Sequence, residues 1–193
     1  MKLHVATFLI LAVSLFSCKK KEMTQGGSSG LAYRSSYEYP HEIRPVVFMD
    51  RIVLEGADPY IEMMGQVAKS ANETTDDGKP VKFNEIQISN IKASTAVVNI
   101  VTQGSFMQDH LTNSKIVFKD MNTETTIATF SNCSSTKITY TISTEDLTQV
   151  FKNVSAGSFY IDFDFDSNSV PDNIKVYYDM FFNYDYTMKQ YKK

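Results

Sequence analysis

The sequence predicts a mainly β protein, and three observations lead to that prediction. Residues 18–193 contain 13 Ile, 13 Val and 16 Thr but only 4 Leu and 8 Ala. β-branched side chains pack well on a pleated sheet, whereas the helices of a bundle need Leu and Ala. Apolar and polar residues alternate along several segments, which indicates strands with one buried face. Turn residues separate about eight such segments, as in a sandwich or a barrel.

Within this class, we expect an antiparallel β-sandwich, immunoglobulin-like or jelly-roll-like, with one short connecting helix. The alternative is an up-and-down β-barrel, because both architectures use short alternating strands. A chain of 193 residues has the length of one domain and can bury a core without a disulfide.

The expected strands begin after Pro45 and continue almost to the end of the chain. The phase of the alternation changes within residues 81–89, which predicts a bulge near Asn84 or Glu85. The alternation is clearest in the last strand, where one phase holds Val176, Tyr178, Met180, Phe182, Tyr184, Tyr186 and Met188. In chain order, the expected strands cover residues 46–54, 81–89, 95–102, 116–118, 124–130, 137–142, 161–166 and 176–188.

The connecting helix is expected after Ser143, which can serve as its N-cap. Acidic residues follow in the first turn, and Leu147, Val150 and Phe151 then share one face.

A second helix can begin at Asp58-Pro59, because Asp58 suits the N-cap and proline suits the first helical position. Ile61, Met63 and Gly65 also fit a strand, so the sequence leaves residues 59–69 open between helix and strand. Residues 70–80 are polar and predict a loop.

The N-terminus has the pattern of a secretory signal peptide. Lys2 supplies a positive charge, and residues 5–16 form an apolar stretch that is too short to span a bilayer. The segment Leu15-Phe16-Ser17-Cys18 follows, and it resembles the lipobox of bacterial lipoproteins.

This resemblance covers the N-terminal segment only. It implies cleavage before Cys18, a diacylglycerol on the Cys18 sulfur, and a further acyl chain such as palmitate on the new amine. Two or more acyl chains hold a protein stably on a membrane. The resemblance therefore implies an anchored protein of the bacterial cell envelope, and we expect the outer membrane, with the periplasmic or surface face left open.

The chain then divides into three parts. Residues 1–17 are the signal peptide, residues 18–44 a lipidated tether with an irregular N-terminal segment, and residues 45–193 a single β domain. Residues 19–30 are rich in Lys, Gly and Ser, the composition of a flexible linker with a reach on the order of 20 Å.

Charge and composition exclude several function classes. Residues 18–193 carry 18 basic and 22 acidic side chains, which argues against nucleic-acid binding. Cys133 has no partner for a disulfide once Cys18 carries lipid, and no neighbour in sequence predicts a reactive thiol. His41 and His110 lie far apart in expected loops, and the chain lacks the motifs of zinc sites, hydrolases and phosphate-binding loops. We therefore expect neither enzyme activity nor a cofactor.

Asp162, Asp164 and Asp166 are the one set of spaced metal-ligating residues. Their spacing matches the start of a calcium-binding EF-hand loop, but Ser167 stands where that loop needs Gly and Asn173 where it needs Glu. We expect instead that the three carboxylates form the wet face of a strand and that Lys or Arg from a neighbouring strand offsets their charge.

Tyr177 and Phe181 are candidate ligand-binding residues, because they lie in the phase of the last strand that is expected to face outward. Exposed rings offer a large contact area to a protein or a glycan. The expected function is a non-enzymatic binding or structural role in the envelope, with a protein, a glycan or another envelope component as partner. A lipocalin-like carrier of a small apolar ligand is the alternative, and a hydrolase with an unrecognised site comes third.

Overall fold

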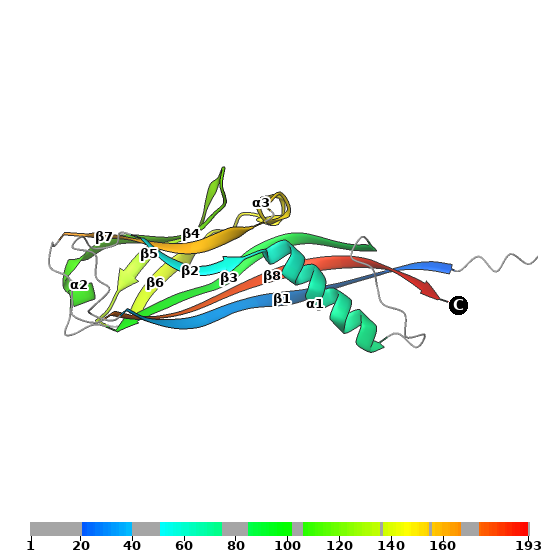
Figure 1. Ribbon diagram of the computed structural model, residues 1–193, viewed down its shortest axis with the longest axis horizontal. Coiled ribbons are helices and arrows are strands. Elements are labelled where there is room, and N and C mark those ends of the chain that lie inside the picture. Colours follow the sequence, from blue (N-terminus) through cyan, green and yellow to red (C-terminus); the bar gives the residue numbers. More distant parts are fainter. Residues whose placement is uncertain are drawn as a thin grey trace, which may run out of the picture.

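The computed structural model describes residues 21–39, 51–74, 85–101, 106–135, 137–154, 156–166 and 174–192. These residues form eight strands in one sheet with the order β1-β8-β3-β6-β5-β4-β7-β2 (Figure 1). The strands are β1 (Lys21–Tyr39), β2 (Arg51–Ala57), β3 (Ile86–Val101), β4 (Leu111–Lys119), β5 (Glu124–Cys133), β6 (Lys137–Ile142), β7 (Gly157–Phe165) and β8 (Ile174–Lys192). The same residues hold the helices α1 (Pro59–Thr74), α2 (Phe106–His110) and α3 (Thr148–Lys152).

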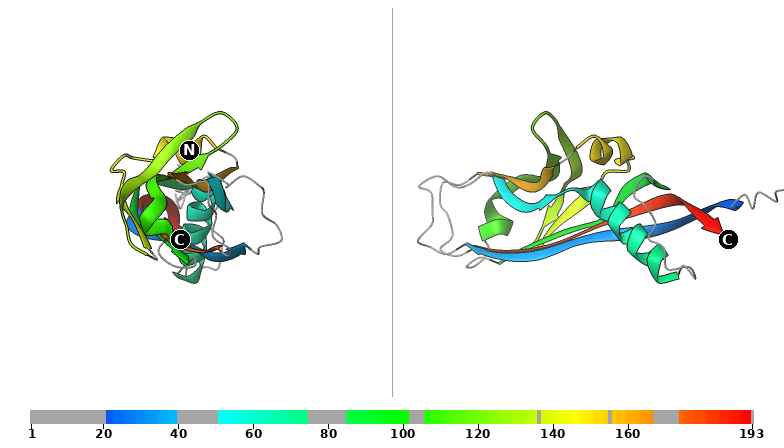
Figure 2. Two further views of the ribbon diagram at one scale, coloured as in Figure 1. Left: turned by 90° about the vertical axis from the view of Figure 1, so that its left-hand side faces the viewer. Right: turned by 45° about the vertical axis from the view of Figure 1, so that its right-hand side comes forward.

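The sheet curls into a half-barrel, which the view along its long axis makes visible (Figure 2). The predicted class, mainly β and antiparallel, is confirmed. Because all eight described strands belong to one sheet, the curl agrees with the barrel alternative rather than with two stacked sheets. The strand order differs from that of an up-and-down barrel, since among these strands only β4, β5 and β6 lie next to their neighbours in sequence.

Aromatic rings fill the concave side of the half-barrel. The ring centroid of Phe159 in β7 lies 4.9 Å from that of Phe118, 5.1 Å from Tyr33 and 5.6 Å from Phe182. Ring pairs at such separations pack favourably. The three partners belong to β4, β1 and β8, so the rings join strands from distant parts of the sheet.

A hydrogen bond also crosses the interior. The hydroxyl of Tyr178 in β8 donates to the carbonyl of Leu54 in the edge strand β2, at 2.9 Å. Five strands lie between β8 and β2 in the order of the sheet, so this bond spans the curl. The interior contacts therefore hold the two sides of the half-barrel together.

The structure assigns residues 59–69 to a helix. The side chain of Asp58 accepts a hydrogen bond from the backbone N–H of Ile61, as predicted for an N-cap. α1 then packs against β1, β3 and α3. The loop predicted for residues 70–80 is wrong for residues 70–74, where α1 continues because Ala71 is buried on its apolar face. Residues 75–80 lie outside the described residues.

The connecting helix α3 is present but begins later than expected. Ser143 does not cap it, because the helix starts at Thr148. Asp146 instead accepts hydrogen bonds from the side chain and the backbone N–H of Thr148, and these bonds hold the pKa of Asp146 below its usual value. The predicted apolar face is confirmed for Leu147 and Phe151, which are buried.

The largest correction concerns the N-terminal segment. Residues 21–39, predicted as tether and irregular chain, form β1, which pairs with β8 from Lys21 opposite Lys192 to Tyr39 opposite Ile174. Residues 1–20 and 40–50, which include the lipobox with Cys18 and also His41, lie outside the described residues.

Two glycines explain why a linker-like sequence forms a strand. A Cβ on Gly30 would lie 2.1 Å from Cζ of Phe181, and a Cβ on Gly27 would lie 2.6 Å from the hydroxyl oxygen of Tyr186. Both rings belong to β8 and cover glycines of β1. Rings across from glycine shield the backbone and pin the register of the strand pair. The glycines of this segment therefore serve packing.

The strands predicted at residues 81–89 and 95–102 form one strand, β3, in the described part of the chain. Its register with β8 shifts between Ser89 and Lys92 and again between Ala93 and Thr95. Within the first shift, Asn90 has a φ of 52°, a left-handed conformation that Asn tolerates. These irregularities lie after Ser89. The bulge predicted near Asn84 or Glu85 stays a prediction, because residues 75–84 lie outside the described residues.

β8 confirms its predicted pattern. Val176, Met180 and Phe182 are fully buried, Tyr186 is half-buried, and the remaining members of that phase, Tyr178, Tyr184 and Met188, are also buried. No helix in the part of the chain that the structure describes is both long and apolar enough to cross a membrane.

Candidate functional site

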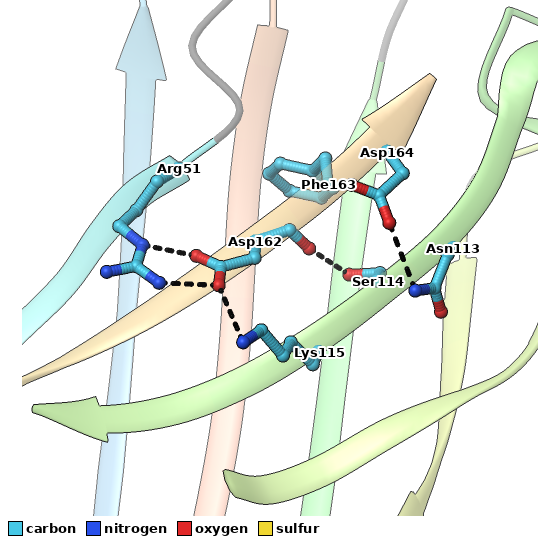
Figure 3. Close-up of a pocket in the computed structure, with 7 residues that line it drawn as sticks. All are labelled: Arg51, Asn113, Ser114, Lys115, Asp162, Phe163 and Asp164. Carbon is cyan, nitrogen blue, oxygen red and sulfur yellow. Dashed lines mark hydrogen bonds and ion pairs between the residues drawn. The ribbon is translucent and has the colours of Figure 1, made fainter. Parts of the chain in front are cut away.

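A small pocket lies over β7, between its neighbours β2 and β4 (Figure 3). Its volume is about 210 Å³, and it is lined by Arg51, Asn113, Ser114, Lys115, Asp162, Phe163 and Asp164. Asp162 and Asp164 are two of the three aspartates that the sequence singled out. The pocket is therefore the first place to test for binding or catalytic chemistry.

The sheet pairing brings the charged residues of the pocket together. In the register, Asp162 of β7 lies opposite Arg51 of β2 on one side and opposite Lys115 of β4 on the other. Directly opposed side chains on one face of a sheet are close enough to interact. The three charges therefore form a row across three strands.

Asp162 is the centre of an ion-pair network. Arg51 binds its carboxylate with two nitrogens, Nε at 2.5 Å and Nη2 at 2.6 Å, while Lys115 Nζ lies 3.5 Å away. Glu124 of β5 accepts hydrogen bonds from both cations, at 3.0 Å from Arg51 Nη2 and 3.0 Å from Lys115 Nζ. The ring of Tyr160 lies 5.2 Å from the Arg51 guanidinium carbon, within the range of a cation–π contact.

These contacts shift the titration of the network. The hydrogen bond from Lys115 holds the pKa of Glu124 below its usual range, and the same bond raises the pKa of Lys115. The hydrogen bond to Asp162 raises the pKa of Arg51. All three groups thus stay charged near neutral pH, as an ion-pair network requires, and none of them is held ready to transfer a proton.

The other two aspartates each have a partner of their own. Asp164 accepts a hydrogen bond from the side-chain amide of Asn113 at 3.0 Å, and Asp166 lies 3.0 Å from Nδ1 of His110. The sequence prediction that Lys or Arg from a neighbouring strand offsets the acidic strand is confirmed for Asp162. Among the described residues, no group of three or more His, Cys, Asp or Glu side chains could hold a metal ion.

Ser114 also lines this pocket, and it is buried. It donates to the backbone carbonyl of Asp162 at 2.6 Å and shares a hydrogen bond of 2.9 Å with the hydroxyl of Tyr140. Burial raises the pKa of Tyr140, so this phenol stays protonated. Ser114 and Tyr140 therefore act as a structural hydrogen-bonded pair rather than as a nucleophile and its base.

Cys133 has the environment of an inert thiol. It is a free cysteine at the end of β5, and its sulfur donates to the backbone carbonyl of Ser134 at 3.1 Å. Burial raises the pKa of the Cys133 thiol, whereas a reactive cysteine needs a lowered one.

The two candidate aromatic residues differ in their surroundings. Tyr177 is 43% exposed, and Phe181 is half-buried because its ring covers Gly30. The structure therefore leaves Tyr177 as the more accessible ring of the two.

A second pocket lies over β5, β6 and the turn that follows β6. Its volume is about 780 Å³, and its lining includes the hydroxyl groups of Thr125, Thr129, Thr141, Ser143 and Thr144. Hydroxyl groups can donate and accept hydrogen bonds, so this surface suits a polar ligand. The sequence indicated these strands but gave no reason to group their threonines into a site.

Sequence reasoning also missed Arg51, Lys115 and Glu124 as partners of Asp162. These residues come from β2, β4 and β5, and only the order of the sheet makes them neighbours. Comparisons of the chain with known protein families, with curated proteins and with solved structures found no match.

Proposed function

We propose that the protein is a membrane-anchored lipoprotein of the bacterial cell envelope whose β domain has a non-enzymatic binding or structural role. The observation that carries the proposal is the segment Leu15-Phe16-Ser17-Cys18 behind an apolar stretch with the features of a signal peptide. Acylation of Cys18 would hold the domain on the membrane surface, with a protein, a glycan or another envelope component as its partner.

The interior of the half-barrel favours this role over that of a carrier. A carrier of small apolar ligands needs an apolar cavity of roughly 300–1,000 Å³. The pocket over β5 and β6 has a volume of about 780 Å³, but its lining is mostly polar. In the described structure, the rings of Phe118, Phe151, Phe159 and Phe182 contact one another across the concave side, with centroids 4.9–6.2 Å apart. Because these rings fill the interior, we expect a partner to bind at the surface of the domain.

The surroundings of the reactive residue types support a role without catalysis. The negative charge of Asp162 is offset by ion pairs with Arg51 and Lys115, and Ser114 is hydrogen-bonded to Tyr140. A catalytic group needs a pKa and a position suited to proton transfer or attack. These groups instead satisfy one another as structural contacts.

Metabolic labelling tests the anchor. The wild-type protein, expressed in a bacterium that is fed a clickable fatty acid, is expected to carry the label and to fractionate with membranes. Cys18→Ala should lose both properties, and Cys133→Ala is the matched control because it removes the other cysteine of residues 18–193. A Cys18→Ala protein that still carries the label would overturn the proposal.

A binding assay separates the proposed role from that of a carrier. An environment-sensitive apolar dye is titrated into the purified protein, and a filled interior predicts no saturable rise in fluorescence. Saturable binding of one dye per chain, lost on acid unfolding, would favour the carrier.

A further inference from the structure

We propose that the outer end of the β1–β8 pair is a membrane-contact tip, which binds anionic lipid headgroups and orients the anchored domain. The tip consists of residues 21–24 of β1 and residues 188–192 of β8. The inference deepens the proposed function and rests on it, because the lipid on Cys18 brings the tip to the membrane.

The geometry isolates this end of the sheet. The backbone register places Lys21 opposite Lys192 and Thr24 opposite Lys189. Among the described residues, β3 pairs with β8 up to Met188, and the residues of β8 after Met188 pair with β1 alone. In Figures 1 and 2, β1 and β8 extend together beyond the rest of the sheet. The start of β1 and the end of β8 therefore form a two-stranded projection.

The sequence makes this projection basic in an acidic protein. The tip itself contains three lysines and one acidic residue, Glu22, a side-chain charge of +2. The residues that adjoin it in sequence, 19–20 and 193, are three more lysines and raise the charge to +5. Residues 18–193 as a whole carry −4, so the rest of them carries −9. An anionic leaflet attracts clustered lysines over about one Debye length and repels the acidic remainder. The charge distribution thus favours an orientation in which this end of the molecule faces the membrane surface.

The position of Cys18 reinforces the selection. Cys18 lies three residues before Lys21, and consecutive Cα atoms are 3.80 Å apart, so the two Cα atoms are separated by about 11 Å at most. A flexible tether through residue 30 would have let the domain move away from the membrane. Because β1 includes Lys21, the acyl chains and the lysines of the tip meet the membrane close together. The opposite end of the pair, where Tyr39 lies opposite Ile174, then points away from the membrane.

The test uses tryptophan fluorescence, because the chain contains no tryptophan. Thr187→Trp puts a reporter beside the tip at an exposed position, and Tyr177→Trp puts a matched reporter at an exposed position on the same strand and the same face. The two positions are ten residues apart, or roughly 33 Å along a strand. The acylated mature protein, which begins at Cys18, is reconstituted into vesicles of brominated phosphatidylcholine, with or without phosphatidylglycerol.

We expect the bromines to quench the Thr187→Trp reporter at least about twofold more than the Tyr177→Trp reporter when phosphatidylglycerol is present. High salt, or the double change Lys189→Glu and Lys192→Glu, should bring this ratio close to about one because it removes the attraction. The same change of charge at two exposed lysines away from the tip, Lys137→Glu and Lys152→Glu, is the control and should leave the ratio unchanged.

Two outcomes would overturn the inference, and they are distinguishable. Equal quenching of both reporters, or a ratio insensitive to the Lys189 and Lys192 changes, in protein that carries the fatty-acid label would reject the tip and leave the proposed anchor standing. Loss of the label together with loss of vesicle association would reject the proposed function, and the tip with it.

Discussion

The ring of Phe181 lies over the backbone of Gly30 on the neighbouring strand, where a Cβ would come within 2.1 Å of the ring. This contact links β8 to β1, which is an edge strand of the half-barrel. An edge strand has a partner on one side only, so its attachment depends on such cross-strand contacts. The pair therefore explains both why residues 21–39 join the sheet and why Phe181 is less exposed than an outward-facing ring should be.

The first prediction follows from this pair. Gly30→Ala should destabilise the protein by about 1–3 kcal/mol, because the ring of Phe181 must move to admit the methyl group. Urea unfolding followed by circular dichroism measures the change. Gly65→Ala in α1 is the matched control. Apart from its chain neighbours and the backbone of its own helix, no atom lies within 4 Å of its Cβ position, so the same substitution should stabilise by about 0.5–1 kcal/mol.

A double mutant checks the cause. In a Phe181→Ala background the ring is absent, so Gly30→Ala should cost much less than it does in the wild type. An equal cost in both backgrounds would contradict the contact between the ring and the glycine.

The second prediction compares the two faces of β8. Phe182 is fully buried, with ring neighbours at 5.5 Å (Phe151) and 5.6 Å (Phe159), so Phe182→Ala should cost about 3–5 kcal/mol. Tyr177 is exposed, and Tyr177→Ala should stay within about 0.5 kcal/mol of the wild type. Thermal melts of the two variants suffice, and similar losses in both would mean that β8 is covered on its outer face.

The strands were predictable where apolar and polar residues alternate along the chain. β8 follows its alternation through Met188, because each inward side chain meets the filled interior. β1 was not predictable, since Gly27 and Gly30 are read as linker residues unless the rings across from them are known. Those rings are more than 150 residues away in the chain, so the composition of residues 21–39 alone cannot predict them.

The candidate site was predictable only in part. The alternation of Asp162, Asp164 and Asp166 indicated a wet strand face and the need for neighbouring cations. Which cations answer that need depends on β7 lying between β2 and β4. A sequence without the strand order cannot select Arg51 and Lys115 from the other basic residues.

The third prediction tests the ion-pair network. Arg51→Met should destabilise by about 1–3 kcal/mol, because Asp162 is only 16% exposed and would lose its bidentate partner. Adding Asp162→Asn should restore part of the loss, since no uncompensated charge then remains. The exposed pair of Arg34 with Asp179 is the comparison, and Arg34→Met should change the urea midpoint little. A larger loss for Arg34→Met than for Arg51→Met would contradict this assignment.

The fourth prediction concerns calcium. The three aspartates are already engaged by Arg51, Asn113 and His110, so calcium should leave the melting temperature nearly unchanged. A specific site at 100 times its Kd would add about 2.7 kcal/mol, which a thermal scan detects easily. A large calcium-dependent rise that Asp164→Asn abolishes would show that the strand is a metal site.

The mass of the protein extracted from bacterial membranes tests the central claim most directly. The account predicts a mature chain that begins at Cys18, lacks residues 1–17, and carries a diacylglycerol on the Cys18 sulfur together with an amide-linked acyl chain. Fragmentation of the N-terminal peptide assigns these groups to Cys18, because the next cysteine is Cys133. A mature chain that begins elsewhere, or an unmodified Cys18, would contradict the lipoprotein assignment.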